Sequence, residues 1–220
     1  MRLTIKYNYM KIKLLAHHQF SMECKLCSFK SLLLVAMLLV ATSNSLAQAS
    51  FETIDGIRYL IDSDTKTATV VPLSGDQKYS GDVAVPEKVK ATDGVEYAVT
   101  TFGENAFKES RGLTSITIPS SVTSLGNACF SGCSGLTSIT IPSSVTSLDN
   151  SCFEKCSGLT NISIPSSVTS LGEDCFAGCS SLTSITIPFS VTTLGSFCFA
   201  SCIYNHRTTK TNQKYPSVNL

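Results

Sequence analysis

LTSITIPSSVTSLGNACFSGCSG, residues 113–135, is the stretch that decides the fold, because the chain repeats it almost unchanged. The next copies are LTSITIPSSVTSLDNSCFEKCSG from Leu136, LTNISIPSSVTSLGEDCFAGCSS from Leu159 and LTSITIPFSVTTLGSFCFASCIY from Leu182, each 23 residues after the last. A partial copy, VTTFGENAFKESRG, begins earlier, at Val99. Self-similarity at a fixed period of this size is the signature of a repeat architecture.

The apolar positions of each copy predict which side chains face inward. Ile116 and Ile118 flank Thr117, and this alternation is typical of a β-strand with one buried face. Pro119 follows at once and would end the strand, because proline has no N–H to donate to a ladder. Gly126, which recurs as glycine or aspartate in the other copies, is expected at a positive-φ turn. The segment 127–133 is expected to form one or two helical turns.

A single 23-residue copy cannot bury its own apolar face. If copies stack about 4.8 Å apart, each covers the next and the inward positions become continuous columns. One predicted column consists of the phenylalanines Phe130, Phe153, Phe176 and Phe199. The sequence therefore predicts a stacked, strand-rich solenoid.

The pattern L-x-x-I-x-I-P-x-S-V-x-x-L-G-x-x-C-F-x-x-C resembles the BspA-type leucine-rich repeat family, closely over 113–202 and loosely over 81–112. The resemblance implies a β-rich leucine-rich repeat solenoid whose 23-residue units each hold one strand and a short helical turn. It also implies a surface or secreted protein that adheres to host or partner proteins or glycans. The preceding stretch, from Phe51 to Leu73, resembles the β-rich start of such arrays and predicts a hairpin cap.

The N-terminal residues predict export. Lys25 and Lys30 precede the apolar run SLLLVAMLLVA at residues 31–41, and Ala47-Gln48-Ala49 follows a short polar stretch. This order of basic flank, short apolar run and small-residue site is typical of a secretory signal peptide. A membrane span needs about 18–20 apolar residues, so no stable span is expected after cleavage.

We therefore divide the chain into five parts. These are a signal peptide with a long basic region (1–49), an N-terminal β cap (50–80), a degenerate first repeat (81–112), four repeats (113–204) and an irregular tail (205–220). The tail lacks the repeat register and no terminal cap is recognisable in it, so we expect either a shortened member of a longer array or a tail that lies over the last repeat.

Charge and histidine content argue against several functions. Removing residues 1–49 leaves 11 basic against 15 acidic side chains, which disfavours nucleic-acid binding. His206 is then the one remaining histidine, so neither a His-dependent catalytic triad nor a histidine metal cage is expected. No G-x-S-x-G elbow occurs. We predict a non-enzymatic protein without catalytic residues, metal or cofactor.

The cysteines follow the repeat, two in each copy, and three interpretations stay open. Thiolates dispersed along an axis do not gather around one metal ion. Disulfides fit an exported chain with an even count, but bridges between stacked copies would strain the bond. The interpretation we favour is a buried column of free thiols that pack as small apolar residues. Its members are Cys133, Cys156, Cys179 and Cys202.

The outward strand residues are the predicted binding face. They form a neutral set of hydroxyls and one amide: Ser115, Thr117, Ser138, Thr140, Asn161, Ser163, Ser184 and Thr186. Such residues also suit any exposed strand, so a purely structural surface spacer is the alternative. Ice binding is a further alternative, because hydroxyls two residues apart on stacked strands form a lattice. Extracellular proteins or glycans are the partners that we expect.

Overall fold

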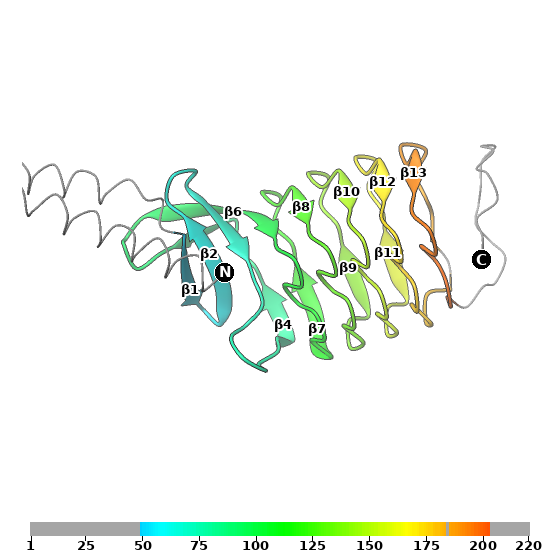
Figure 1. The fold of residues 1–220 in the computed structure, drawn as a ribbon, viewed down its shortest axis with the longest axis horizontal. Helices are drawn as coiled ribbons and strands as arrows, with labels where there is room; N and C mark the ends of the chain where they lie inside the picture. The colour runs from blue at the N-terminus through cyan, green and yellow to red at the C-terminus, as the bar shows by residue number, and fades with distance from the viewer. Residues whose placement is uncertain (1–48, 184, 203–220) are drawn as a thin grey trace, which may run out of the picture. The chain divides into compact units, whose positions relative to one another are not determined.

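The computed structural model describes residues 49–183 and 185–202. Strands β1 to β13 follow one another through this part of the chain, and it contains no helix (Figure 1). The predicted signal peptide, apart from Ala49, and the predicted tail at 205–220 lie outside the described residues. The strand-rich solenoid expected from the repeats is confirmed.

The N-terminal part of the described chain is an antiparallel sheet that leads into the repeats. β1 (Ser50–Ile54) pairs with β2 (Ile57–Asp62), and β2 pairs with β3 (Thr67–Val70). β3 then pairs in parallel with β6 (Glu96–Phe102), and β5 (Lys88–Lys90) pairs with β6 in the antiparallel sense. The predicted hairpin corresponds to β2 and β3, and β1 extends it by a strand.

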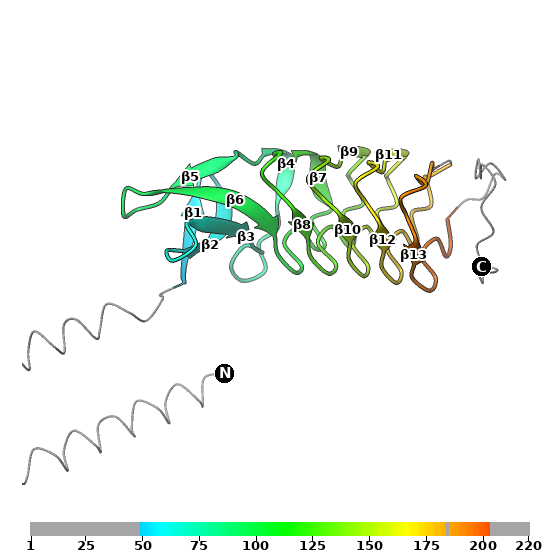
Figure 2. The ribbon, with the colours of Figure 1, turned by 90° about the horizontal axis from the view of Figure 1, so that it is seen from above.

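Each 23-residue copy is called a rung below. The first three rungs each place a strand on two opposite sides, whereas the fourth places a strand on one side and a single bridge residue, Thr186, on the other. On one side β6 continues into short parallel strands: β8 (Ser124–Leu125), β10 (Ser147–Leu148), β12 (Ser170–Leu171) and β13 (Thr193–Leu194). On the other side lie two parallel pairs: β4 (Ser80–Ala84) with β7 (Gly112–Thr117), and β9 (Ser138–Thr140) with β11 (Asn161–Ser163). Figure 2 shows the two sides separated by the interior.

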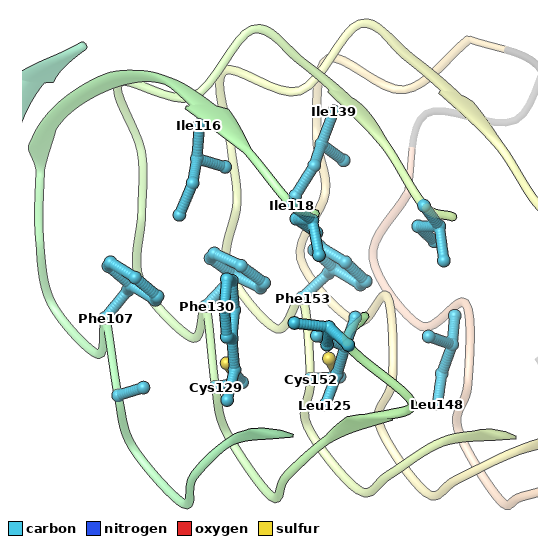
Figure 3. Packing of buried hydrophobic residues seen from close by; sticks show 14 of the residues in the cluster. Phe107, Ile116, Ile118, Leu125, Cys129, Phe130, Ile139, Leu148, Cys152 and Phe153 are labelled. Carbon is cyan, nitrogen blue, oxygen red and sulfur yellow. The ribbon is translucent and has the colours of Figure 1, made fainter. Parts of the chain in front are cut away.

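The core lies between these two sides and is built of columns that run along the stack. The phenylalanine column is continuous, with neighbouring ring centroids 5.1–5.5 Å apart and ring planes within 6° of parallel. Its members are Phe107, Phe130, Phe153, Phe176 and Phe199. Tyr79 closes its N-terminal end, tilted against Phe107 at 4.7 Å. Figure 3 shows two isoleucine positions beside these rings and Cys129 and Cys152 below them.

The helical turns expected at 127–133 are wrong. The amides of Cys129, Ser131 and Cys133 do bond to carbonyls three residues back, but the amides that alternate with them bond to the next rung. Phe130, for example, donates to the carbonyl of Cys152 at 2.8 Å. Ala128 and Gly132 have positive φ, which a right-handed helix excludes. The segment is a series of tight turns that shares its hydrogen bonds with its neighbour.

The expectation of positive φ at Gly126 is also wrong, since positive φ occurs two and six residues later instead. Glycine occurs at this position because rungs approach closely there. A Cβ on Gly126 would lie 2.9 Å from the backbone nitrogen of Glu104, and one on Gly195 would lie 2.3 Å from that of Glu173. Asp149 takes the glycine position in the second rung and is partly buried.

Within residues 49–183 and 185–202 we find no helix with the length and apolar character that a membrane crossing requires.

Candidate functional site

The predicted outward residues lie on the side formed by β7, β9 and β11. All of those described are exposed: Ser115, Thr117, Ser138, Thr140, Asn161, Ser163 and Thr186. Ser184 lies outside the described residues. We call the exposed strand residues of this side the hydroxyl face.

Backbone pairing aligns the hydroxyl face from rung to rung. Asn161 pairs with Ser138, and Ser163 pairs with Thr140, in the parallel ladder of β9 and β11. Ser163 also forms a parallel bridge with Thr186. The pairs bring equivalent side chains of three successive rungs side by side. Ser115 and Thr117 belong instead to β7, which pairs with β4 and lies next to β9.

One column of this face was missed by the sequence analysis. Thr114, Thr137, Thr160 and Thr183 are exposed at the start of each outward strand. The amide and the hydroxyl of Thr160 both bond to the carbonyl of Thr137, at 3.0 and 3.2 Å. A signal was present in the sequence, because threonine follows the first leucine in all four copies.

Asp82 marks the N-terminal edge of the hydroxyl face and was also missed. The hydroxyls of Thr114 and Ser115 both donate to Asp82 Oδ1 at 2.7 Å. These bonds favour the ionised carboxylate and lower the pKa of Asp82. Glu87 accepts a similar bond from Ser120 Oγ at 2.7 Å. The hydroxyl face therefore begins at two carboxylates, although its strands carry no charge.

A second set of serines has a different role, because its hydroxyls hold neighbouring rungs together. Ser121 Oγ donates to the Val99 carbonyl, and Ser167 Oγ to the Val145 carbonyl, both at 2.7 Å. Ser144 and Ser190 make the equivalent bonds. By contrast, the side chains of the β9 and β11 residues of the hydroxyl face have no hydrogen-bond partner within the described part of the chain. Their polar groups are available to a ligand.

The charges of the rungs lie away from the hydroxyl face. Between Leu113 and Cys202 the charged residues are Asp149, Glu154, Lys155, Glu173 and Asp174. They belong to the turn segments that follow β10 and β12, and none lies on an outward strand. Lys155 and Glu154 form an ion pair at 2.7 Å. The hydroxyl face is therefore a neutral surface over successive rungs.

All eight described cysteines are free thiols in the interior, and only Cys202 is partly exposed. In each rung the second cysteine donates its S–H to the carbonyl of a phenylalanine one rung back, as Cys133 does to Phe107 at 3.0 Å. Cys156, Cys179 and Cys202 repeat this bond at 3.1 Å. Burial raises the pKa of Cys133 to about 12, which disfavours the reactive thiolate. No group of metal-binding side chains occurs among the described residues.

Comparison with known families gives a match to the model described as "BspA type Leucine rich repeat region", in six copies over residues 96–215. Solved structures give related matches. A leucine-rich repeat protein from Bacteroides ovatus ATCC 8483 is 35% identical with a TM-score of 0.63 over 69% of this chain. The T. pallidum leucine-rich repeat protein is 27% identical with a TM-score of 0.58 over 66%.

A leucine-rich repeat protein from Bacteroides capillosus ATCC 29799 is 27% identical over 62% of this chain, with a TM-score of 0.52. The matches cover 39%, 64% and 96% of the B. ovatus, T. pallidum and B. capillosus proteins respectively. The chain thus spans well under two thirds of the first of these relatives. None of the curated proteins matches this chain significantly.

Proposed function

This chain belongs to the BspA-type leucine-rich repeat family, and from that premise we propose that it is a secreted or cell-surface protein whose task is binding rather than catalysis. Its hydroxyl face would contact extracellular or host proteins or glycans. The observation that carries this proposal is that its serines and threonines fall into two sets with different hydrogen bonding. Those beside the core bond to a neighbouring rung, whereas the polar side chains of β9 and β11 are exposed and have no hydrogen-bond partner within the described residues.

The chemistry of the hydroxyl face favours an uncharged, extended ligand. Hydroxyls and an amide both donate and accept hydrogen bonds, so they suit sugar hydroxyls or peptide groups alike. Each such bond contributes about 0.5–1.5 kcal/mol, so useful affinity requires contacts on several rungs at once. The parallel pairing of Ser138 with Asn161, and of Thr140 with Ser163, supplies that repetition. Because the face is neutral, we expect affinity to change little with salt.

The test is a binding screen of the chain, without residues 1–49, against arrays of glycans and extracellular-matrix proteins. A ligand found there is then measured against a variant with Ser138→Glu and Ser163→Glu, which places two charges on the hydroxyl face. The control is Thr146→Glu, which adds a charge at an exposed position beside β10 on the opposite side.

The proposal expects a loss of affinity of at least tenfold in the double variant and less than twofold in the control. Equal losses would show that the ligand does not use the hydroxyl face. If no ligand is found and the double variant folds normally, the chain acts as a structural spacer, and the binding proposal is wrong.

A further inference from the structure

The rungs that carry the hydroxyl face repeat at a short and regular distance. Neighbouring rings of the phenylalanine column are 5.1–5.5 Å apart and their planes lie within 6° of parallel. Figures 1 and 2 show β7, β9 and β11 following one another in a row along the stack. Hydrogen-bonded strands lie about 4.7–4.9 Å apart. A ligand that lies along this row therefore meets equivalent side chains about every 5 Å.

Two columns of polar side chains run along this row, one toward each end of the outward strands. Ser138 and Asn161 pair across the ladder in the first column, and Thr140 and Ser163 pair in the second. Thr186 continues the second column through its bridge to Ser163. Residues two apart on a strand are separated by about 6–7 Å. The strip between the columns is therefore about as wide as a sugar ring.

The period of the rungs discriminates between the extended polymers that fit this strip. An extended polypeptide advances about 6.6 Å for each pair of residues, so its equivalent side chains lose register with the rungs. A β-1,4-linked chain of hexopyranoses is stiff and extended, and it advances by nearly one rung for each sugar. Its successive rings are turned over, so both of its edges offer hydroxyls to the column beside them.

A cross-β fibril is the polypeptide that does match the period, with a repeat of about 4.7–4.8 Å. Its sheets, however, pair through dry and interdigitated side chains. A dry contact would bury the donors and acceptors of the hydroxyl face without partners, and this costs free energy. A sugar chain instead supplies a hydroxyl to each of them. The polar character of the columns therefore favours the glycan.

The charges around the face select among glycans. Strands β7, β9 and β11 carry no ionisable side chain, and the face begins at the carboxylates of Asp82 and Glu87. A chain of uronic acids or sulfated sugars would bring anions to a surface that offers them no cation and two like charges. A neutral chain avoids this repulsion.

An exposed aromatic ring also lies beside the end of the second column. Phe189 follows Thr186 by three residues and is 67% exposed. The earlier rungs have exposed serines at this position, so its exposure is a property of the repeat. A phenyl ring offers an apolar face on which the C–H face of a sugar can stack.

We propose that the hydroxyl face binds an unbranched, neutral β-1,4-glucan that lies along the stack with one sugar on each rung. This inference rests on the proposed binding function and narrows its ligand to one polymer. One edge of the glucan exchanges hydrogen bonds with Ser138 and Asn161, and the other edge with Thr140 and Ser163. Repetition over successive rungs adds these individually weak bonds together.

Calorimetric titration of the full chain with cello-oligosaccharides of two to six sugars tests the register. We expect each added sugar, up to the fourth, to tighten binding by about two- to tenfold, because it reaches the hydroxyls of one more rung. Laminarihexaose and maltohexaose are the matched controls. They contain the same glucose units, but their β-1,3 and α-1,4 linkages make the chains curl away from the strip. Both should bind about tenfold more weakly than cellohexaose, or worse.

Variants of the chain locate the bound glucan. Ser138→Glu combined with Ser163→Glu should remove cellohexaose binding, whereas Thr146→Glu, on the opposite side, should change it by less than about twofold. Thr140→Ala removes one hydroxyl without adding a charge and should weaken binding by about two- to tenfold. Unchanged circular dichroism spectra would confirm that the variants fold.

The possible results separate this inference from the proposed function. Equal affinity for cellohexaose and laminarihexaose, or no gain with length, would overturn the register of one sugar per rung. Cellohexaose binding that survives the double glutamate variant would contradict the hydroxyl face as the site. Absence of cellohexaose binding would overturn the inference alone if another ligand from the arrays is lost in that variant. If fibrils of a glutamine-rich peptide are that ligand, the matching period serves a polypeptide instead.

Discussion

Replacing Phe153 by alanine should be one of the most damaging single changes in the solenoid. The ring is fully buried and stacks between Phe130 at 5.3 Å and Phe176 at 5.4 Å. Removing a buried phenylalanine side chain costs about 3–5 kcal/mol in transfer and cavity terms, and the lost aromatic pairs are worth about 0.5–1.5 kcal/mol each. Because these terms overlap, we expect a loss of about 4 kcal/mol in the free energy of unfolding.

Phe153→Ala leaves the backbone contacts of this position in place. The Phe153 amide donates to the Cys175 carbonyl at 2.8 Å, and its carbonyl accepts the Cys179 thiol at 3.1 Å. The loss therefore reports on the ring itself. Because rungs contact only their neighbours, we also expect the variant to broaden the unfolding transition, as the two halves of the stack lose their coupling.

The assay is urea unfolding followed by circular dichroism, with linear extrapolation to water. Phe153→Leu, which keeps much of the volume, should cost about 1–2 kcal/mol. Phe51→Ala is the exposed control and should cost no more than about 1 kcal/mol, since its main contact is the Arg58 guanidinium over the ring at 4.4 Å. A loss below about 1.5 kcal/mol for Phe153→Ala, or one equal to the control, would refute a continuous ring column as a main source of stability.

Ser167→Ala removes a hydrogen bond between rungs and should lower the free energy of unfolding in urea by about 1 kcal/mol. The control Ser166→Ala, at an exposed neighbour, should change it by no more than about 0.5 kcal/mol. Equal effects of the two substitutions would contradict the role of Ser167 between rungs. Burial raises the pKa of Asp149, so its stabilising contribution is present below its ordinary pKa and is lost as pH rises through the folded-state value. Asp149→Asn should therefore raise the melting temperature more at pH 7 than at pH 3, and a pH-independent difference would count against this. Iodoacetamide should modify Cys202 in the native protein well before Cys175, as mass spectrometry of digests would show; simultaneous labelling would contradict the burial gradient.

The fold was predictable because, in a stack of repeats, the long-range contacts join equivalent positions of neighbouring copies, and the pattern within one copy identifies those positions. Once the 23-residue period is known, a residue such as Ile139 must lie against its equivalents, so alternation within one strand identifies the buried face of all of them. Phe130 follows by the same logic: a ring in every rung can be buried only if the rings stack. The structure buries both residues.

The turn segments were not predictable from local spacing. Phe130 and Cys133 are three residues apart, which resembles one face of a helix, and three of the amides in the segment do bond to carbonyls three residues back. The bonds that decide the conformation reach Cys152 and Glu154, in the next rung. The same holds for Gly126, whose constraint is the backbone of Glu104. In both cases the controlling contact is 22 residues away in the sequence.

The candidate site was partly predictable for a related reason. Alternation placed Ser138 and Thr140 outside, and the structure exposes both. The sequence could not distinguish these residues from Ser144, because residue type alone does not show whether a serine hydroxyl bonds to a neighbouring rung or has no partner. Asp82 escaped notice because it lies in a degenerate copy, where only the pairing of β4 with β7 brings it to Ser115.

The positions that vary between rungs indicate where the solenoid can carry specificity. Stacking requires like residues in the interior columns, and the serines between rungs are equally constrained because each must reach a carbonyl of the rung before it. The hydroxyl face has no such requirement, and there the third rung reads TNISIP where the others read TSITIP. Asn161 and Ser163, the two changed residues, are exposed and two apart on β11. In a structural spacer these positions would only have to be soluble. In a binding protein they would determine which ligand is bound, because they are among the few side chains that stacking does not constrain.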